Sequence, residues 1–150
     1  VAVLADVEES WTEPVNARIR KLDGVVFRRL RSEVVEDQLA RESVEFKAEV
    51  KQLKDELAQA HAENKAAIQA QIDEAKKKAQ VMQEQAKTRI DQARREADAK
   101  IAAMQEQLEH ASDRQKAKIE KRIAEVKADL EARHAKLQEA GRLAGEALAI

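Results

Sequence analysis

Three histidines, His61, His110 and His134, are the side chains of this sequence best suited to hold a transition metal or to titrate near neutral pH. Two ligands on one helix face must lie three or four residues apart, and no two of these histidines do. Glu106, four residues before His110, gives the one suggestive carboxylate–histidine spacing around that residue. Cysteine is absent, which excludes thiolate ligands and disulfides. We therefore predict no metal site and interpret His61, Asn64 and His134 as polar residues that set helix register and partner number.

A cluster of six basic residues is the second candidate site, because it lies within only fourteen positions. Such a cluster could bind an anionic partner: a phosphate, a lipid headgroup or nucleic acid. Neither an aromatic stacking platform nor a glycine-rich loop accompanies it, and pairing with Asp6, Glu8, Glu9 and Glu36 is the alternative. The cluster consists of Arg18, Arg20, Lys21, Arg28, Arg29 and Arg31.

The composition of the chain argues against catalysis. Aromatic residues make up 2% of the sequence, and 28 basic against 29 acidic residues leave a net charge of −1. That balance gives no general attraction to nucleic acid, which we do not expect as a partner. No nucleophile–base pair, no pair of carboxylates in a recognisable pocket and no phosphate loop is present. We predict a non-enzymatic protein with no cofactor and no small-molecule substrate.

The first third of the chain predicts a strand, a helix and a second strand. Residues 1–7 are rich in β-branched residues and predict a strand. Ser10 and Glu13 have the spacing of a helix capping box, and Gly24 supplies a stop. Residues 25–30 predict the second strand. Residues 1–31 therefore form an expected incomplete βαβ module, which needs a second βαβ half as its partner because two strands and one helix bury too little surface.

A resemblance accompanies this prediction. The stretch VAVLADVEESWTEPV, with LDGVVFRR further on, resembles a segment of uncharacterised bacterial stress-associated proteins. The resemblance covers roughly residues 1–40. It implies a ferredoxin-like half followed by a charged helical tail, and no reaction.

The remaining two thirds predict one very long amphipathic helix, so the fold class is mainly α. Between Gly24 and Gly141 there is no glycine and no proline, and apolar residues repeat every eleven positions. This hendecad period favours straight or right-handed packing of helices against partners. We predict a coiled coil over residues 32–140 and a small-residue tail over 141–150. The oligomer stripe comprises Phe46, Val50, Leu53, Leu57, Ile68, Ile72, Ile90, Ile101, Met104, Leu108, Ile119, Ile123, Val126, Leu130 and Leu137.

Two places could turn the helix back on itself, around residues 61–64 and around residues 111–113. A turn usually resets the register of the next helix, yet the columns through Leu53 and Phe46 continue across both. We therefore expect one rod from about residue 33, with Ser32 as its N-cap, to about residue 140, on the order of 160 Å long. A hairpin hinged near Ser112 is the alternative.

These patterns together predict a self-associating helical rod that acts as scaffold, spacer or stalk. Residues 86–101 resemble the hydrophilic stalk of bacterial ATP synthase b subunits, as do residues 70–110 in composition. No run of about 18 apolar residues is present, and we expect a cytoplasmic protein, with peripheral contact at the inner membrane as an alternative. The partner is a second copy or another helical protein. An amphipathic helix that binds lipid reversibly, or a bracing subunit docked on a large complex, are the other hypotheses.

Overall fold

The structure, a computed structural model, describes residues 2–5 and 13–149. It contains the helices α1 (Glu13–Arg20), α2 (Arg31–Gln59), α3 (Ala62–Glu109) and α4 (Asp113–Leu148). The mainly α class is confirmed. The expected βαβ module is wrong, because no strand occurs in the described residues.

The two expected strands do not form, because neither segment has a neighbouring strand. Residues 2–5 and 25–30 belong to no helix and no sheet, since a strand needs a neighbour to bond its backbone. Leu4 is fully exposed and Phe27 is 90% exposed. β-branched sequence alone therefore does not make a strand here. The Ser10 half of the expected capping box lies outside the described residues.

Helix α1 ends where glycine was expected to stop it. The backbone N–H of Gly24 donates to the carbonyl of Ile19 at 3.0 Å, while Asp23 takes the left-handed conformation with φ of 53°. A Cβ on residue 24 would lie 2.6 Å from Cγ2 of Ile19, so only glycine fits this turn without a shift. α1 packs against none of the other three helices in the described part of the chain.

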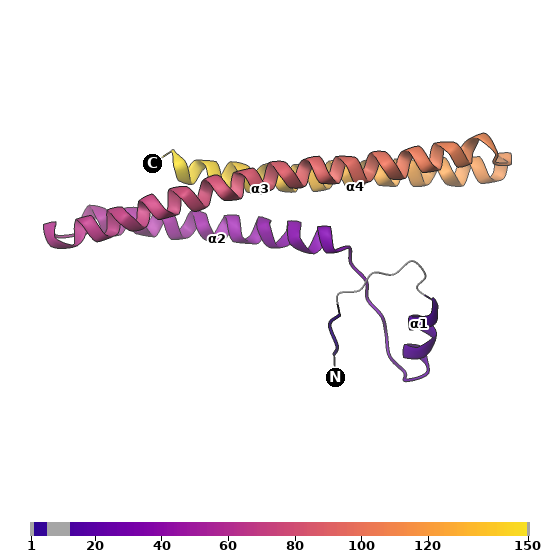
Figure 1. Ribbon diagram of the computed structural model, residues 1–150, viewed down its shortest axis with the longest axis horizontal. Coiled ribbons are helices and arrows are strands. Elements are labelled where there is room, and N and C mark those ends of the chain that lie inside the picture. The colour runs from indigo at the N-terminus through magenta and orange to yellow at the C-terminus, as the bar shows by residue number, and fades with distance from the viewer. Residues whose placement is uncertain (1, 6–12, 150) are drawn as a thin grey trace.

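The expected continuous rod is wrong, because the chain turns back twice. Residues 60–61 separate α2 from α3, and residues 110–112 separate α3 from α4. The three helices are packed together, α3 antiparallel to α2 and α4 (Figure 1). At the second turn the Ser112 N–H donates to Oε1 of Gln115 at 3.1 Å, which caps α4. Ser32, the expected N-cap, lies inside α2, whose cap position is Leu30.

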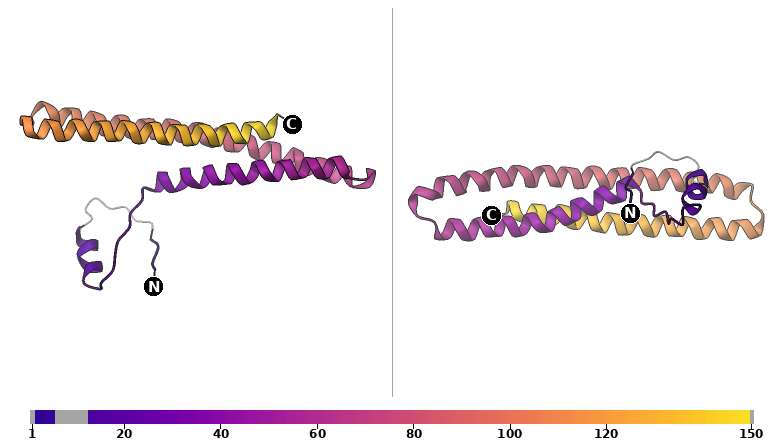
Figure 2. Two further views of the ribbon diagram at one scale, coloured as in Figure 1. Left: turned by 180° about the vertical axis from the view of Figure 1, so that it is seen from behind. Right: turned by 90° about the horizontal axis from the view of Figure 1, so that it is seen from below.

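The three helices overlap only in part. α3, with 48 residues, is about 72 Å long. At one end α3 and α4 continue past the start of α2, and at the other α2 and α3 continue past the end of α4 (Figure 2). We call the outer part of the α3–α4 pair, residues 97–109 with 113–132, the distal arm. Its inner turn, residues 97–100 with 129–132, lies level with the first residues of α2.

The core lies where all three helices overlap. Phe46 and Leu137 are its largest buried apolar side chains, and alanines fill most of the rest. Small side chains allow close approach of α3 and α4: a Cβ on Gly141 would lie 3.5 Å from the Cβ of Ala86. α4 continues through Gly141 and Gly145 to Leu148. The core consists of Leu39, Phe46, Val50, Ala75, Ala79, Met82, Ala86, Leu137, Ala140, Ala144 and Ala147.

This fold predicts a cross-link that a straight rod forbids. Nζ of Lys47 lies 2.6 Å from Oε2 of Glu146, whereas a continuous helix would separate the two residues by about 150 Å. A carbodiimide should therefore join Lys47 to Glu146 within one chain, as read by mass spectrometry. Mixing isotope-labelled and unlabelled protein identifies links between chains, and Glu146→Gln is the control that should abolish the product. Links found only between chains would contradict the folded arrangement.

Candidate helix-docking groove

A buried ion network joins the three helices where the distal arm begins. Arg133 of α4 donates to Glu36 of α2 through Nε and Nη2, at 2.9 Å to Oε2 and 2.6 Å to Oε1. The same Nη2 donates to Oε2 of Glu96 on α3 at 3.1 Å. Glu36 is 1% exposed and Arg133 5% exposed. The hydrogen bond with Glu36 raises the pKa of Arg133 further, so its guanidinium stays charged.

A second, more exposed pair of contacts surrounds Asp37. Its carboxylate accepts hydrogen bonds from Arg29 and from Lys136 of α4. The bond from Arg29, followed by that from Lys136, lowers the pKa of Asp37 to about 2. The bond to Lys136 joins the start of α2 to α4 at the residue that follows Glu36, and the bond to Arg29 holds the segment before α2 against the same carboxylate.

Beyond this layer, α3 and α4 of the distal arm leave a groove open between them. Two adjoining hollows, of about 440 and 560 Å³, form it and share Arg122. The inner hollow also includes Arg133, the residue that contacts α2. The groove therefore continues the seat that α2 occupies in the three-helix part. Its lining comprises Ala97, Lys100, Met104, Glu106, Gln107, His110, Ala111, Gln115, Lys118, Ile119, Arg122, Glu125, Val126, Asp129 and Arg133.

The apolar side chains of this groove are only half covered. Met104, Ile119 and Val126 are partly exposed, whereas Met82 of α3 and Leu137 of α4, in the three-helix part, are buried. The difference arises because α2 covers one region and stops short of the other. The groove of the distal arm thus has an apolar floor and charged rims. It is as wide as the space that α2 fills in the three-helix part.

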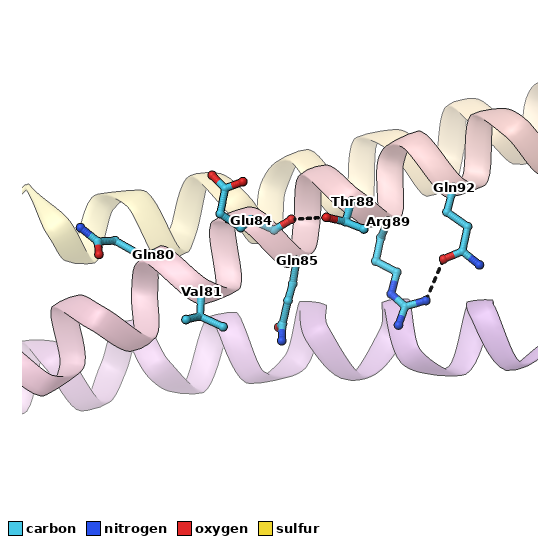
Figure 3. Close-up of a pocket in the computed structure, with 7 residues that line it drawn as sticks. All are labelled: Gln80, Val81, Glu84, Gln85, Thr88, Arg89 and Gln92. Atoms are coloured by element: carbon cyan, nitrogen blue, oxygen red, sulfur yellow. Dashed lines mark hydrogen bonds between the residues drawn. The ribbon is translucent and has the colours of Figure 1, made fainter.

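A third hollow, of about 500 Å³, belongs to α3 alone (Figure 3). Thr88 Oγ1 donates to the carbonyl of Glu84 at 2.9 Å, and Arg89 Nη1 donates to Oε1 of Gln92 at 2.9 Å. These polar groups bind one another on a single helix. The one hydroxyl in its lining, that of Thr88, is engaged by a backbone carbonyl of the same helix. Its lining comprises Gln80, Val81, Glu84, Gln85, Thr88, Arg89 and Gln92.

The residues of the expected oligomer stripe lie on the inward faces of α2, α3 and α4. Four of them, Phe46, Val50, Ile72 and Leu137, are buried. The remaining eleven are partly buried. Much of the stripe expected to face other chains therefore packs within this chain, and the part left open lies at the two-helix ends. These partly buried residues are Leu53, Leu57, Ile68, Ile90, Ile101, Met104, Leu108, Ile119, Ile123, Val126 and Leu130.

The expected polar register residues lie apart. His61 and Asn64 are exposed at the first turn, where the Asn64 N–H donates to the His61 carbonyl at 3.0 Å. His134 is partly buried on α4, next to Arg133. His110 lies at the second turn, beside the groove. Among the described residues no cluster of three or more histidine, aspartate or glutamate side chains is arranged to hold a metal.

The basic cluster is largely engaged by neighbouring side chains. Arg20 binds Glu13, Arg28 Nη1 donates to Oδ1 of Asn16 at 2.6 Å, and Arg29 binds Asp37. Arg18 and Lys21 lie on or just after α1 and are exposed. Of the pairing partners expected from the sequence, Asp6, Glu8 and Glu9 lie outside the described residues, and Glu36 binds Arg133 instead.

The sequence prediction missed the buried ion network. Glu36 and Arg133 lie on the inward faces of α2 and α4, where the inward positions repeat every seven residues and not every eleven. In α2 the inward positions are 36, 39, 43, 46 and 50, and in α4 they are 130, 133, 137, 140 and 144. Two charged residues of opposite sign in these heptad positions were the available signal.

Comparisons with protein-family models, with curated proteins and with solved structures find no match to this chain. The resemblance to a ferredoxin-like half with a helical tail is wrong, because no strand forms in the described residues. No match supports the resemblance to ATP synthase b subunits either. Within the described residues, no helix combines the length and the hydropathy needed to cross a membrane.

Loss of Arg133 should destabilise the fold strongly. Arg133→Ala leaves the buried carboxylate of Glu36 without its partner, which typically costs about 3–5 kcal/mol of unfolding free energy. Urea unfolding followed by circular dichroism measures this loss. Arg142→Ala, which removes an exposed arginine bound to Glu139 and Glu146 on the same helix, is the control and should change stability little. Equal stability of the two variants would show that the network does not hold α2 in place.

Acid should weaken the contact between α2 and α4 in a defined range. Folding lowers the pKa of Asp37 from 3.8 to about 2. The contribution of Asp37 to the free energy of unfolding is therefore complete above its unfolded pKa of 3.8. It is lost as the pH falls from about 4 to about 2. Asp37→Asn should be less stable than the unchanged chain at neutral pH and should lose less stability across this range. Urea unfolding at several pH values tests this, and parallel pH profiles for the two proteins would contradict it.

Proposed function

We propose that this chain is a structural, non-enzymatic protein: a helical scaffold or spacer that associates through the groove of its distal arm. The half-exposed apolar floor of that groove is the observation that carries the proposal. The lining side chains combine apolar residues with charges of both signs, as the contact faces of associating helices do.

Energetics favour a partner at this groove. Full burial of a valine, leucine, isoleucine or methionine side chain contributes about 1.5–3 kcal/mol. Met104, Ile119 and Val126 keep part of that gain unused while α3 and α4 pack as a pair. Because helices in proteins owe most of their stability to tertiary packing, covering the groove also stabilises the arm itself.

The shape of the molecule supports a spacing role. α3 alone extends about 72 Å, and the buried ion network fixes α2 and α4 against it at one level. Reaction chemistry has no support in the three hollows described above, where the one hydroxyl side chain of the lining, Thr88, donates to a backbone carbonyl. A long body with one open apolar face suits holding partners at a distance.

Association through this groove predicts that the chain sediments as a dimer or a larger oligomer. Val126→Glu should raise the dissociation constant at least about tenfold, because it places an unpaired charge on the apolar floor. Val81→Glu is the matched control, since Val81 is 56% exposed and lies outside the groove. Analytical ultracentrifugation measures both, with circular dichroism to verify that helicity is kept. A monomer at all concentrations would overturn the proposal.

A further inference from the structure

The two turns of the bundle are built differently. At the second turn Ser112 caps α4, with its N–H donating to Oε1 of Gln115 at 3.1 Å. The first turn consists of Ala60 and His61, both with extended backbone. In the described part of the chain His61, the N-cap residue of α3, makes no side-chain cap hydrogen bond. The first turn therefore lacks the cap that fixes the second.

The residues around the first turn favour a helix over a bend. Between Gly24 and Gly141 the chain has no glycine and no proline, and alanine, the best helix former, lies on both sides of His61. Each helix end also leaves up to four backbone groups without a partner in its own helix. If residues 60–61 became helical, these groups would bond one another across the former turn. α2 and α3 would then form one straight helix, residues 31–109, about 118 Å long.

The inward faces of α2 and α3 coincide in such a straight helix. Their inward residues at steps of eleven are Phe46, Leu57, Ile68 and Ala79. Eleven residues make three helical turns with a remainder of about 20°, so the four side chains lie within about 60° of one another. A hairpin does not require this agreement. A straight helix that packs along its whole length does require it.

We propose that the first turn is a hinge through which two copies of this chain exchange α2. In the exchanged dimer each chain has one straight helix over residues 31–109, and the two straight helices lie antiparallel with their hinges side by side. α2 of each copy then covers α3 and α4 of the other copy. Exchange of an identical element is a low-cost route to a dimer, and short hinges promote it. This association uses the face that α2 covers and not the groove, so it goes beyond the proposed function.

The exchange keeps the contacts of the three-helix part. α2 is antiparallel to α3 in the bent chain (Figure 1), and antiparallel straight helices reproduce this direction. Arg133 binds Glu36 of the second copy in place of its own, and Glu96 stays on the same side of the guanidinium. Only residues next to the hinge change their neighbours. The buried ion network must open before α2 can leave, so exchange is slow once the chain has folded.

Both copies of α4 fit in the exchanged dimer. Glu146 of α4 contacts Lys47 of α2, so Leu148, the last residue of α4, lies level with about residue 49 of α2. The hinge is about 11 residues further along α2, a distance of about 16 Å. The two copies of α4 lie on opposite sides of the hinges and therefore end about 33 Å apart.

The exchanged dimer moves two polar residues from the surface to the inward face. His61 and Asn64 are exposed in the bent chain. In the straight helix His61 comes four residues after Leu57 and Asn64 four residues before Ile68, so both share the face of those residues. The two copies of His61 then meet at the centre of the dimer. Polar residues at such positions set partner number and register at a cost in stability, so the bent chain and the dimer compete.

A cross-link distinguishes exchange from association through the groove. Nζ of Lys47 lies 2.6 Å from Oε2 of Glu146 in the bent chain, whereas in the exchanged dimer the same contact joins two chains. Isotope-labelled and unlabelled protein should be unfolded in urea, refolded together at high concentration and separated by size. Carbodiimide should then link Lys47 to Glu146 between chains in the dimer fraction and within one chain in the monomer fraction. A dimer whose links all lie within one chain would overturn the exchange, as would the absence of any dimer.

Proline at the hinge provides a matched pair of variants. Ala62 is the first residue of α3, where proline is tolerated, and His61 before it is already extended. In the straight helix Ala62→Pro would break both chains of the dimer, and it should raise the dissociation constant more than about a hundredfold. Asp113→Pro is the control, because it occupies the same position of α4 after the extended Ser112. It should leave the exchanged dimer unchanged, and circular dichroism verifies that both variants fold. An unchanged dimer in Ala62→Pro would overturn the hinge.

The outcomes separate this inference from the proposed function. Val126→Glu changes the groove floor beyond the start of α2, so it should spare the exchanged dimer, which Ala62→Pro removes. A dimer lost in Val126→Glu but kept in Ala62→Pro overturns the exchange alone. A dimer lost in Ala62→Pro but unaffected by Val126→Glu overturns the groove proposal alone. Small-angle scattering gives an independent check, because two bodies of about 72 Å joined end to end should measure about 147 Å.

Discussion

The rest of this structure depends on one buried arrangement of charges, with Arg133 between Glu36 and Glu96. Each of the three helices contributes one side chain, and removing charges from water is costly unless every partner is in place. A shift of α2 by one helical turn would move Glu36 about 5.4 Å away from the guanidinium. The network therefore determines which residues of the three helices share a level more than it adds net stability. Alanine-rich helix faces, which pack acceptably in several registers, need such a determinant.

The same network explains why the molecule has a groove. Because it fixes Glu36 beside Arg133, Arg31 at the start of α2 lies level with about residue 128 of α4, about 16 residues short of the turn between α3 and α4. The part of α3 and α4 beyond it keeps the residue pattern of a helix face that packs on two neighbours, yet it has only one. Met104 and Val126 remain partly exposed for this reason. Fixing the register and leaving an open apolar face are two results of one set of contacts.

The sequence predicted the helical content but not the path of the chain. The inward positions followed from the spacing of Phe46, Ile72 and Leu137, because helix faces are set locally. The eleven-residue columns continue across both turns and for that reason predict one unbroken helix. A short turn between antiparallel helices reverses the direction of the chain. The repeat of apolar residues can therefore continue in the same register whether or not a turn is present. The Ser112–Gln115 capping pair was a better signal. The groove was not predictable, since it depends on where a helix distant in sequence begins, and Glu36 and Arg133 could have marked that level.

The position of the segment before α2 has a mechanical consequence. This segment joins the bundle at the side, near the inner end of the groove, and not at either end of the body (Figure 1). Anything attached to it is held at the flank of the rod, while the turn around His61 is left free at the far end.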